Sequence, residues 1–325
     1  MKHGYLLLML PPIFVYLVAT VLFELSATNR SGDLPSKIGA LIASQNLTTL
    51  SFQLTEMKVR YMWFATTVVN FTVCLYAAVL CGTIIYRSHS VRRLMLMKAI
   101  GLVLVIAGIG SLIYSAMTKN MMFQLIYYFS FHTLEHTKYY GPTFLGHIDA
   151  LLALANALAV IVPCLVLLAA SSTLAPPVDK TQDHLAHLTI QMRHLRGVLN
   201  IGSAILVGGT LNMHAWLRWP TGLVLDSNVQ SAYAGAALAI TMFWGTTFTL
   251  MLITTYGPAA SYLSFQARDF AERARQAGTI QDPQRWLHDN HFSITLGEQL
   301  PQIGVILGPL LAGPIGSFLM SHVSS

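Results

Sequence analysis

The stretch YMWFATTVVNFTVCLYAAVLCGTIIY (61–86) decides the fold, because it runs for 26 residues without a charged side chain. A helix of roughly 20 apolar residues crosses the hydrocarbon core of a bilayer. The whole chain of 325 residues is 54% hydrophobic and 10% charged, whereas a soluble domain carries about 25% charged residues. Five further apolar stretches have spanning length: about 5–24, 99–117, 149–172, 200–220 and 232–256. We therefore predict an all-α, polytopic membrane helical bundle with six transmembrane helices.

The connections between these stretches predict the orientation. Twelve of the nineteen lysines and arginines lie on one side, at Lys2, in 87–98, in 173–199 and after residue 257. Basic loops stay in the cytoplasm. We therefore expect a multi-pass protein of a bacterial-type inner (cytoplasmic) membrane with both termini cytoplasmic. Tyrosine and tryptophan mark the opposite side, and we interpret them as an interfacial belt: Tyr61, Trp63, Tyr127, Tyr128, Tyr139, Tyr140, Trp216 and Trp219.

The net charge of +6 does not predict nucleic-acid binding, because the basic residues cluster at the ends of apolar segments. Membrane lipid is the expected partner. The three cysteines, Cys74, Cys81 and Cys164, lie inside apolar runs and indicate small buried side chains, with no disulfide framework.

Two amphipathic helices are expected outside the six spans. The first covers 36–57 on the outer side, and its apolar stripe includes Leu47, Leu50 and Leu54. It would pack on the chain's own outer loops, a second copy or another subunit. The second covers 181–199 on the cytoplasmic side, with an apolar row at a/d spacing: Leu185, Leu188, Met192 and Leu195. We assign both rows as candidate partner-binding residues.

The chain after residue 257 is expected to form a cytoplasmic unit, 258–325, attached to a transmembrane unit, 1–257. It begins with an amphipathic helix at 263–278 and ends with an apolar segment at 300–320. That segment contains Pro301, Pro309 and Pro314, and proline interrupts helices. We therefore expect a broken-helix C-terminal segment packed on or re-entering the membrane, with a seventh crossing as the alternative.

The stretch FHTLEHTKYYGPTFLGHID (131–149) is the strongest candidate for a chemical site. His132 and His136 are four residues apart and share one helical face, so they can hold one metal ion, with Glu135 as a second-shell group. His147 and His214 map to the same side and complete the candidate metal set. Imidazole suits zinc, copper, iron and haem.

HTLEH (132–136) also resembles the H-x-x-E-H signature of the inverzincin metallopeptidases, which implies His132 and His136 as ligands and Glu135 as base. That family expects a downstream glutamate as third ligand. The later glutamates, Glu272 and Glu298, fall on the opposite side of the predicted membrane. The resemblance covers five residues, and we do not expect a peptidase.

No residue is assigned a catalytic role. No phosphate-binding loop, dinucleotide fingerprint, nucleophile elbow or C-x-x-C pair occurs in the sequence. No span carries Asp, Glu, Lys or Arg near its middle, although ion-coupled transporters usually do. The leading hypothesis is a non-enzymatic membrane protein without a cofactor that acts through association with other subunits or with itself, as a subunit of a membrane complex, a sensor or a membrane effector. The alternatives are a metal- or haem-binding redox subunit and a small-solute channel lined by threonines, including Thr246 and Thr249.

Overall fold

The computed structural model describes residues 4–26, 34–45, 49–176, 184–278, 281–290, 292 and 296–323, and its regular elements there are all helical. In chain order they are η1 (Gly4–Met9), α1 (Leu10–Leu25), α2 (Leu34–Ala43), α3 (Leu50–Ser88), α4 (Val91–Thr118), η2 (Phe123–Tyr128), α5 (Phe129–His136), α6 (Pro142–Ser172), α7 (His184–Arg218), η3 (Trp219–Leu223), α8 (Ser227–Gln276), α9 (Pro283–Asp289) and α10 (Leu296–Val323). The predicted all-α class is confirmed for these residues.

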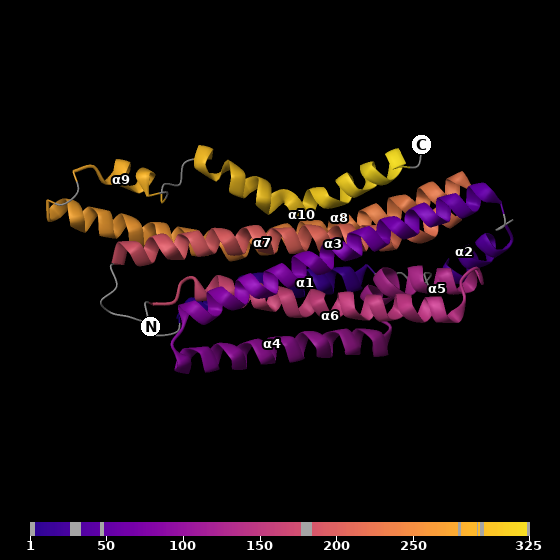
Figure 1. Cartoon of the computed structure of the whole chain (residues 1–325), viewed down its shortest axis with the longest axis horizontal. Coiled ribbons are helices and arrows are strands. Elements are labelled where there is room, and N and C mark those ends of the chain that lie inside the picture. The colour runs from indigo at the N-terminus through magenta and orange to yellow at the C-terminus, as the bar shows by residue number, and fades with distance from the viewer. Residues whose placement is uncertain are drawn as a thin grey trace.

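The long helices run back and forth between two ends of an elongated bundle (Figure 1). One end, here the basic end, holds the turn between α3 and α4, the start of α7 and the end of α8. The other, here the aromatic end, holds η2, α5 and η3. α10 runs from the basic end to the aromatic end, antiparallel to α8. The start of α1 and the last turn of α10 therefore lie at opposite ends of the bundle, whereas we expected both termini on one side.

Among the residues that the structure describes, six helices are long and apolar enough to cross a membrane, as many as predicted, but one member of the set differs. Five of the predicted stretches lie in α1, α3, α4, α6 and α8. The sixth qualifying segment is Pro301–Leu319 in α10, whereas the predicted stretch 200–220 in α7 does not qualify.

α7 is less apolar because it faces other helices. It packs against α3, α8 and α10 together, and its polar side chains bond to each of them. Asn212 accepts hydrogen bonds from Thr66 and Thr67 of α3, at 3.3 and 2.8 Å. Ser203 donates to the carbonyl oxygen of Val305 in α10. A helix buried among helices can satisfy such groups, which lipid cannot.

α10 corrects the expected broken-helix segment, since Leu296–Val323 is one helix that contains all three prolines. Its glycines let it settle between α7 and α8. A Cβ on Gly313 would lie 3.2 Å from Thr241 of α8, and one on Gly316 would lie 3.1 Å from His214 of α7. The close approach on both sides supplies packing that offsets the backbone hydrogen bonds lost at proline.

The two amphipathic helices are also placed differently. The expected outer helix 36–57 is two helices, α2 and the first turns of α3, with a break after Ala43. The expected cytoplasmic helix 181–199 is the first part of α7, continuous with the stretch 200–218. α8 likewise continues without interruption from the apolar stretch 232–256 into the amphipathic stretch 263–276.

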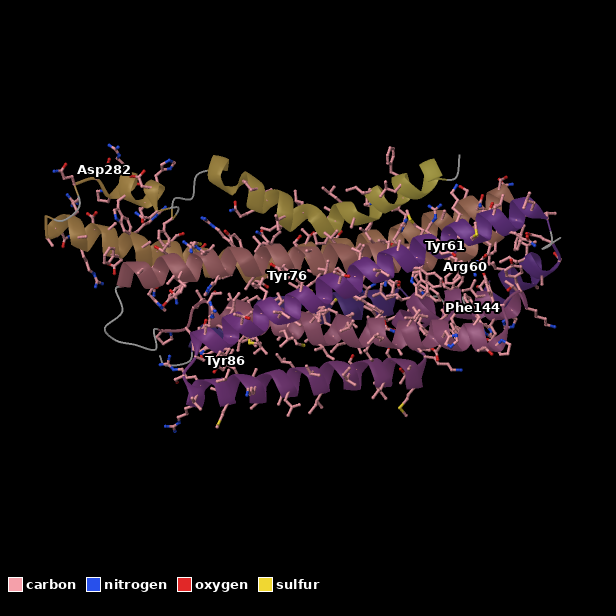
Figure 2. All side chains as sticks on the ribbon, in the orientation of Figure 1. Arg60, Tyr61, Tyr76, Tyr86, Phe144 and Asp282 are labelled. Atoms are coloured by element: carbon pink, nitrogen blue, oxygen red, sulfur yellow. The ribbon has the colours of Figure 1, made fainter. Side chains whose placement is uncertain are left out.

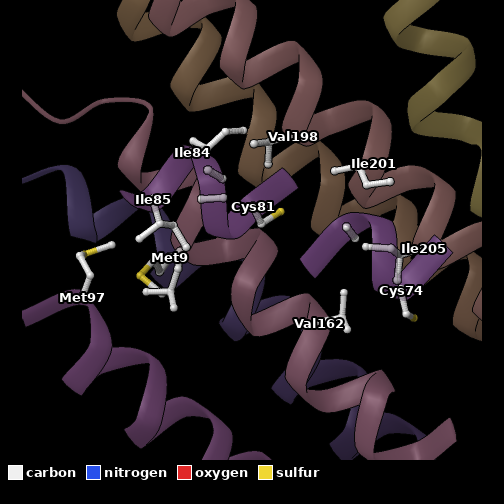
Figure 3. Close-up of a cluster of buried hydrophobic side chains, with 14 of the residues drawn as sticks. Met9, Cys74, Cys81, Ile84, Ile85, Met97, Val162, Val198, Ile201 and Ile205 are labelled. Atoms are coloured by element: carbon white, nitrogen blue, oxygen red, sulfur yellow. The ribbon is translucent and has the colours of Figure 1, made fainter. Parts of the chain in front are cut away.

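The buried apolar side chains of the described residues form four clusters, and two of these contain the predicted cysteines and tryptophans. Towards the basic end, Cys74 and Cys81 of α3 pack with Ile201 and Ile205 of α7 and with Val162 of α6 (Figure 3). The prediction of buried cysteines is confirmed for these two, whereas Cys164 is only partly buried. At the aromatic end, the tryptophans that we interpreted as a membrane-facing belt are core residues. Trp63, Trp216 and Trp219 are 0%, 3% and 0% exposed and lie with ring centroids 5.3–6.0 Å apart. The indoles of these residues pack against one another, and such aromatic contacts stabilise a core.

Candidate functional site

The candidate site lies on α5, and two side chains hold the segment directly before this helix. Glu24 at the end of α1 accepts hydrogen bonds from the backbone N–H groups of Met121 and Met122, at 2.8 and 3.1 Å. These are orphan donors at a helix start, and a carboxylate there is stabilised by the helix dipole. The indole of Trp216 donates to the carbonyl oxygen of Ile126, at 2.8 Å. Ile126 belongs to η2, which is a π-helix, a form frequent at functional sites.

The last turn of α5 brings together His132, Glu135 and His136. One donor atom from each lies within 4.8 Å of the others, the one such group found among the described residues. Nδ1 of His132 is 3.0 Å from Oε2 of Glu135, and the two imidazole centroids are 3.9 Å apart. His132 also stacks on Tyr128, with centroids 4.5 Å apart. The spacing i, i+3, i+4 puts all three on one helical face.

His136 is the most constrained of the three. Its Nδ1 donates to the carbonyl oxygen of His132, at 2.9 Å, which leaves the lone pair on Nε2. Its Cβ faces α2, where a Cβ on Gly39 would lie 2.4 Å away. Only glycine at residue 39 allows α2 to pack this closely on the last turn of α5.

The other two predicted ligands do not join this group. His147 is an exposed residue near the start of α6. His214 is fully buried, and its Nδ1 donates to the hydroxyl of Thr241, at 3.2 Å, between α7, α8 and α10. The Thr241 hydroxyl itself donates to the carbonyl oxygen of Ala237. The sequence predicted four histidines at one end of the bundle. In the structure, only His132 and His136 lie together, because His147 is exposed on α6 and His214 is buried between helices.

A second polar group at this end was missed by the sequence reasoning. Glu56 of α3 is 1% exposed, forms an ion pair with Arg60 at 3.2 Å and accepts a hydrogen bond from Tyr140 at 2.8 Å. The Arg60 guanidinium lies 5.8 Å from the ring centre of Phe144 (Figure 2). Burial, and then the Glu56 carboxylate, raise the pKa of Tyr140, so the phenol stays a donor. The i, i+4 spacing of Glu56 and Arg60 was the available signal.

Tyr127 and Asp149 form a further pair beside the α5 turn, since the phenol donates to the carboxylate. Burial of the Tyr127 ring, followed by the hydrogen bond and charge of Asp149, raises the pKa of Tyr127. Among the described residues, this end of the bundle holds five carboxylates, at Glu24, Glu56, Glu135, Asp149 and Asp226, the last of which caps α8. Two of them accept hydrogen bonds from phenols.

The candidate partner-binding residues divide into two groups. Leu50 and Leu54 are 70% and 51% exposed on the first turns of α3. Leu188, Met192 and Leu195 are buried against this chain's own α8 and α9. Their a/d spacing is thus explained by internal packing, without a partner. Leu47, and the side chain of Leu185, lie outside the described residues.

The two threonines proposed as a channel lining differ in their surroundings: Thr249 is buried, and its hydroxyl has no hydrogen-bond partner among the described residues. Thr246 is exposed, and its hydroxyl donates to the carbonyl oxygen of Met242. A crevice between α6, α7 and α8 lies elsewhere, and its walls are apolar apart from Thr255 and Tyr256. Ions and polar solutes would find few partners in such a crevice.

α4 presents the least covered surface of the bundle. Its main contact is with α6, where Cβ atoms on Gly101 and Gly108 would lie 2.8 and 2.4 Å from Leu168 and Val160. Only 6% of its most apolar window is buried, against 39% for α8. On the uncovered side, a Cβ on Gly110 would meet nothing within 4 Å.

Comparison of the chain with protein-family models, with curated proteins and with solved structures found no match.

Proposed function

We propose that this chain is a multi-pass inner-membrane protein that acts without catalysis, by associating through α4 with other membrane subunits or with a second copy. The single observation that supports the proposal is the position of α4. It is a helix of membrane-spanning length that touches the bundle along one face and leaves the rest uncovered (Figure 1).

The uncovered face of α4 has the chemistry of a helix–helix contact. Ala107, Gly110 and Ser111 are small and exposed, and larger apolar side chains flank them, such as Ile106 and Ile113. Small residues let a second helix approach closely, and packing then replaces the hydrophobic effect that lipid cannot supply. Leu50 and Leu54 add an exposed apolar patch at the aromatic end.

The test is a leucine substitution that the chain itself can accommodate. Gly110→Leu adds bulk on α4 where nothing lies within 4 Å, and Gly82→Leu does the same on α3. We expect Gly110→Leu to weaken association about tenfold, which corresponds to about 1.4 kcal/mol, and Gly82→Leu to leave it unchanged. The assay is quantitative co-purification from native membranes, with cross-linking to count copies. A wild-type chain that stays monomeric and brings no stoichiometric partner would refute the proposal, as would equal effects of the two variants.

We also propose that the basic end is cytoplasmic, which places the start of α1 in the cytoplasm and the α5 turn outside. The bias of lysine and arginine towards that end supports this orientation. Cysteines introduced at Arg92 and Asp226, at opposite ends of the bundle, test it. An impermeant maleimide added to intact cells should label the residue-226 variant alone, and labelling of the residue-92 variant would reverse the topology.

A further inference from the structure

We propose that His132, Glu135 and His136 form a Zn²⁺ site at the aromatic end of the bundle. The proposal goes beyond association through α4 and uses different residues. It rests on three donor side chains in one turn of α5, on the hydrogen bond that orients His136, and on the ring contacts that fix His132.

The spacing of the donors is close to what the ion requires. In a tetrahedral zinc site with bonds of about 2.0–2.1 Å, neighbouring donors are roughly 3.4 Å apart. Nδ1 of His132 and Oε2 of Glu135 are already 3.0 Å apart, and the three donor atoms fall within 4.8 Å. Zn²⁺ would replace the hydrogen bond between His132 and Glu135, with the ring proton of His132 moving to Nε2. The Glu135 side chain is 55% exposed, so it can adjust without disturbing the core.

The hydrogen bond made by Nδ1 of His136 orients the imidazole so that Nε2 can bind a metal ion. Histidines that bind metals usually donate their second ring N–H to a carbonyl or carboxylate, which fixes the tautomer and the ring orientation. Nδ1 of His136 donates to the carbonyl oxygen of His132, so Nε2 carries the lone pair. The contact of its Cβ with α2 near Gly39 holds the side chain at its root.

The donor set favours zinc over haem at this turn. Two imidazoles and one carboxylate form a well-known zinc ligand set that leaves a fourth position open. Two axial histidines of a haem bind on opposite sides of the iron, which puts their ring centres roughly 6 Å apart with the porphyrin between them. The centroids of His132 and His136 are 3.9 Å apart, and this leaves no room for a porphyrin.

A bound ion would join three side chains of the turn on which α2 packs. Zn²⁺ that binds only the folded chain stabilises it by mass action. Because the three donors belong to one turn, the gain is expected to be local to α5 and to the α2 contact at Gly39. The site would thus set how firmly the outer helices are held together.

The test is a Zn²⁺ titration of the full-length, detergent-purified chain, carried on an affinity tag that contains no histidine. Calorimetry, supported by competition with a chromophoric chelator, should show one equivalent bound. His132→Ala and His136→Ala should each lower the affinity by at least about tenfold. His147→Ala removes an exposed histidine outside the group and should change nothing. His136→Ala keeps the Cβ that faces Gly39, so the packing of α2 is retained.

Circular dichroism and gel filtration verify folding. Glu135→Gln changes a half-exposed side chain and gives an independent reading if an alanine variant does not fold. Zn²⁺ should also raise the thermal midpoint of the wild type and of His147→Ala, but not of His136→Ala, and X-ray absorption should show two imidazole ligands. Less than a stoichiometric ion in the wild type, or equal affinity in wild type, His136→Ala and Glu135→Gln, would overturn the proposal.

Discussion

Gly245 of α8 gives the sharpest test of how α10 is seated. A Cβ added at this position would lie 2.5 Å from the carbonyl oxygen of Pro309 and 3.2 Å from the Cα of Leu310. Ordinary contact begins near 3.4 Å, so Gly245→Ala pushes the Cβ about 0.9 Å too close to backbone atoms that cannot rotate away. The α10 helix as a whole must withdraw.

The magnitude follows from two opposing effects. Overpacking of this kind costs about 1–3 kcal/mol. Replacing glycine by alanine inside a helix returns about 1 kcal/mol of helix propensity. Gly235→Ala, in the same helix but with nothing within 4 Å of the added Cβ, carries the second effect alone. We therefore expect Gly245→Ala to be less stable than Gly235→Ala by about 1–3 kcal/mol, or about 2–6 °C in the thermal midpoint.

Thermal unfolding in detergent measures the difference, and a thiol probe shows where it arises. Ala312 of α10 is 1% exposed. A cysteine there should react with maleimide faster in the Gly245→Ala background than in the Gly235→Ala background. Equal midpoints and equal labelling would refute the close packing of α10 between α7 and α8.

Three further changes probe other contacts. Asn212→Leu removes the acceptor of two α3 hydroxyls and should cost about 0.5–2 kcal/mol in chemical denaturation, whereas Thr72→Val, an exposed hydroxyl bonded within α3, should cost little. Burial, and then Arg93, lower the pKa of His89 below its ordinary value of about 6.5. The unfolded chain then binds more protons, so the thermal midpoint of the wild type should fall as pH drops below about 6.5, and that of His89→Gln should stay flatter. Glu24→Gln weakens the charged cap on two backbone N–H groups before α5 and should speed their hydrogen exchange, with unchanged exchange counting against the cap.

Hydropathy predicted five of the six apolar helices of spanning length, but not the contacts between helices. The stretches in α1, α3, α4, α6 and α8 were found because each is apolar over the length that a bilayer core requires. α7 carries Ser203, Asn212 and His214 because three neighbouring helices supply their partners, and no local pattern shows that. For α10, the three prolines predicted a break, but close packing on both sides keeps it one helix.

The candidate site was predictable as far as it is local. His132, Glu135 and His136 come from one helical turn, and sequence spacing alone brings them together. Grouping them with His147 and His214 required tertiary distances, and there the prediction went beyond what spacing shows. The prediction that the tryptophans form an interfacial belt was wrong for the same reason. Trp63 and Trp219 look like interface anchors in the sequence, and only the fold shows them to be 0% exposed.

The length of α8 has a mechanical consequence. Fifty residues at 1.5 Å each make a rod of about 75 Å, more than twice the roughly 30 Å of a hydrocarbon core. No hinge loop separates the apolar part from the charged part, and one interior proline, Pro258, marks their junction. If α8 moves as a rigid rod, a tilt at its Asp226 end also displaces the arginines at its other end, near Gln276. Spin labels at the two tips should give a single narrow distance distribution, and a broad one would reveal a joint at the proline.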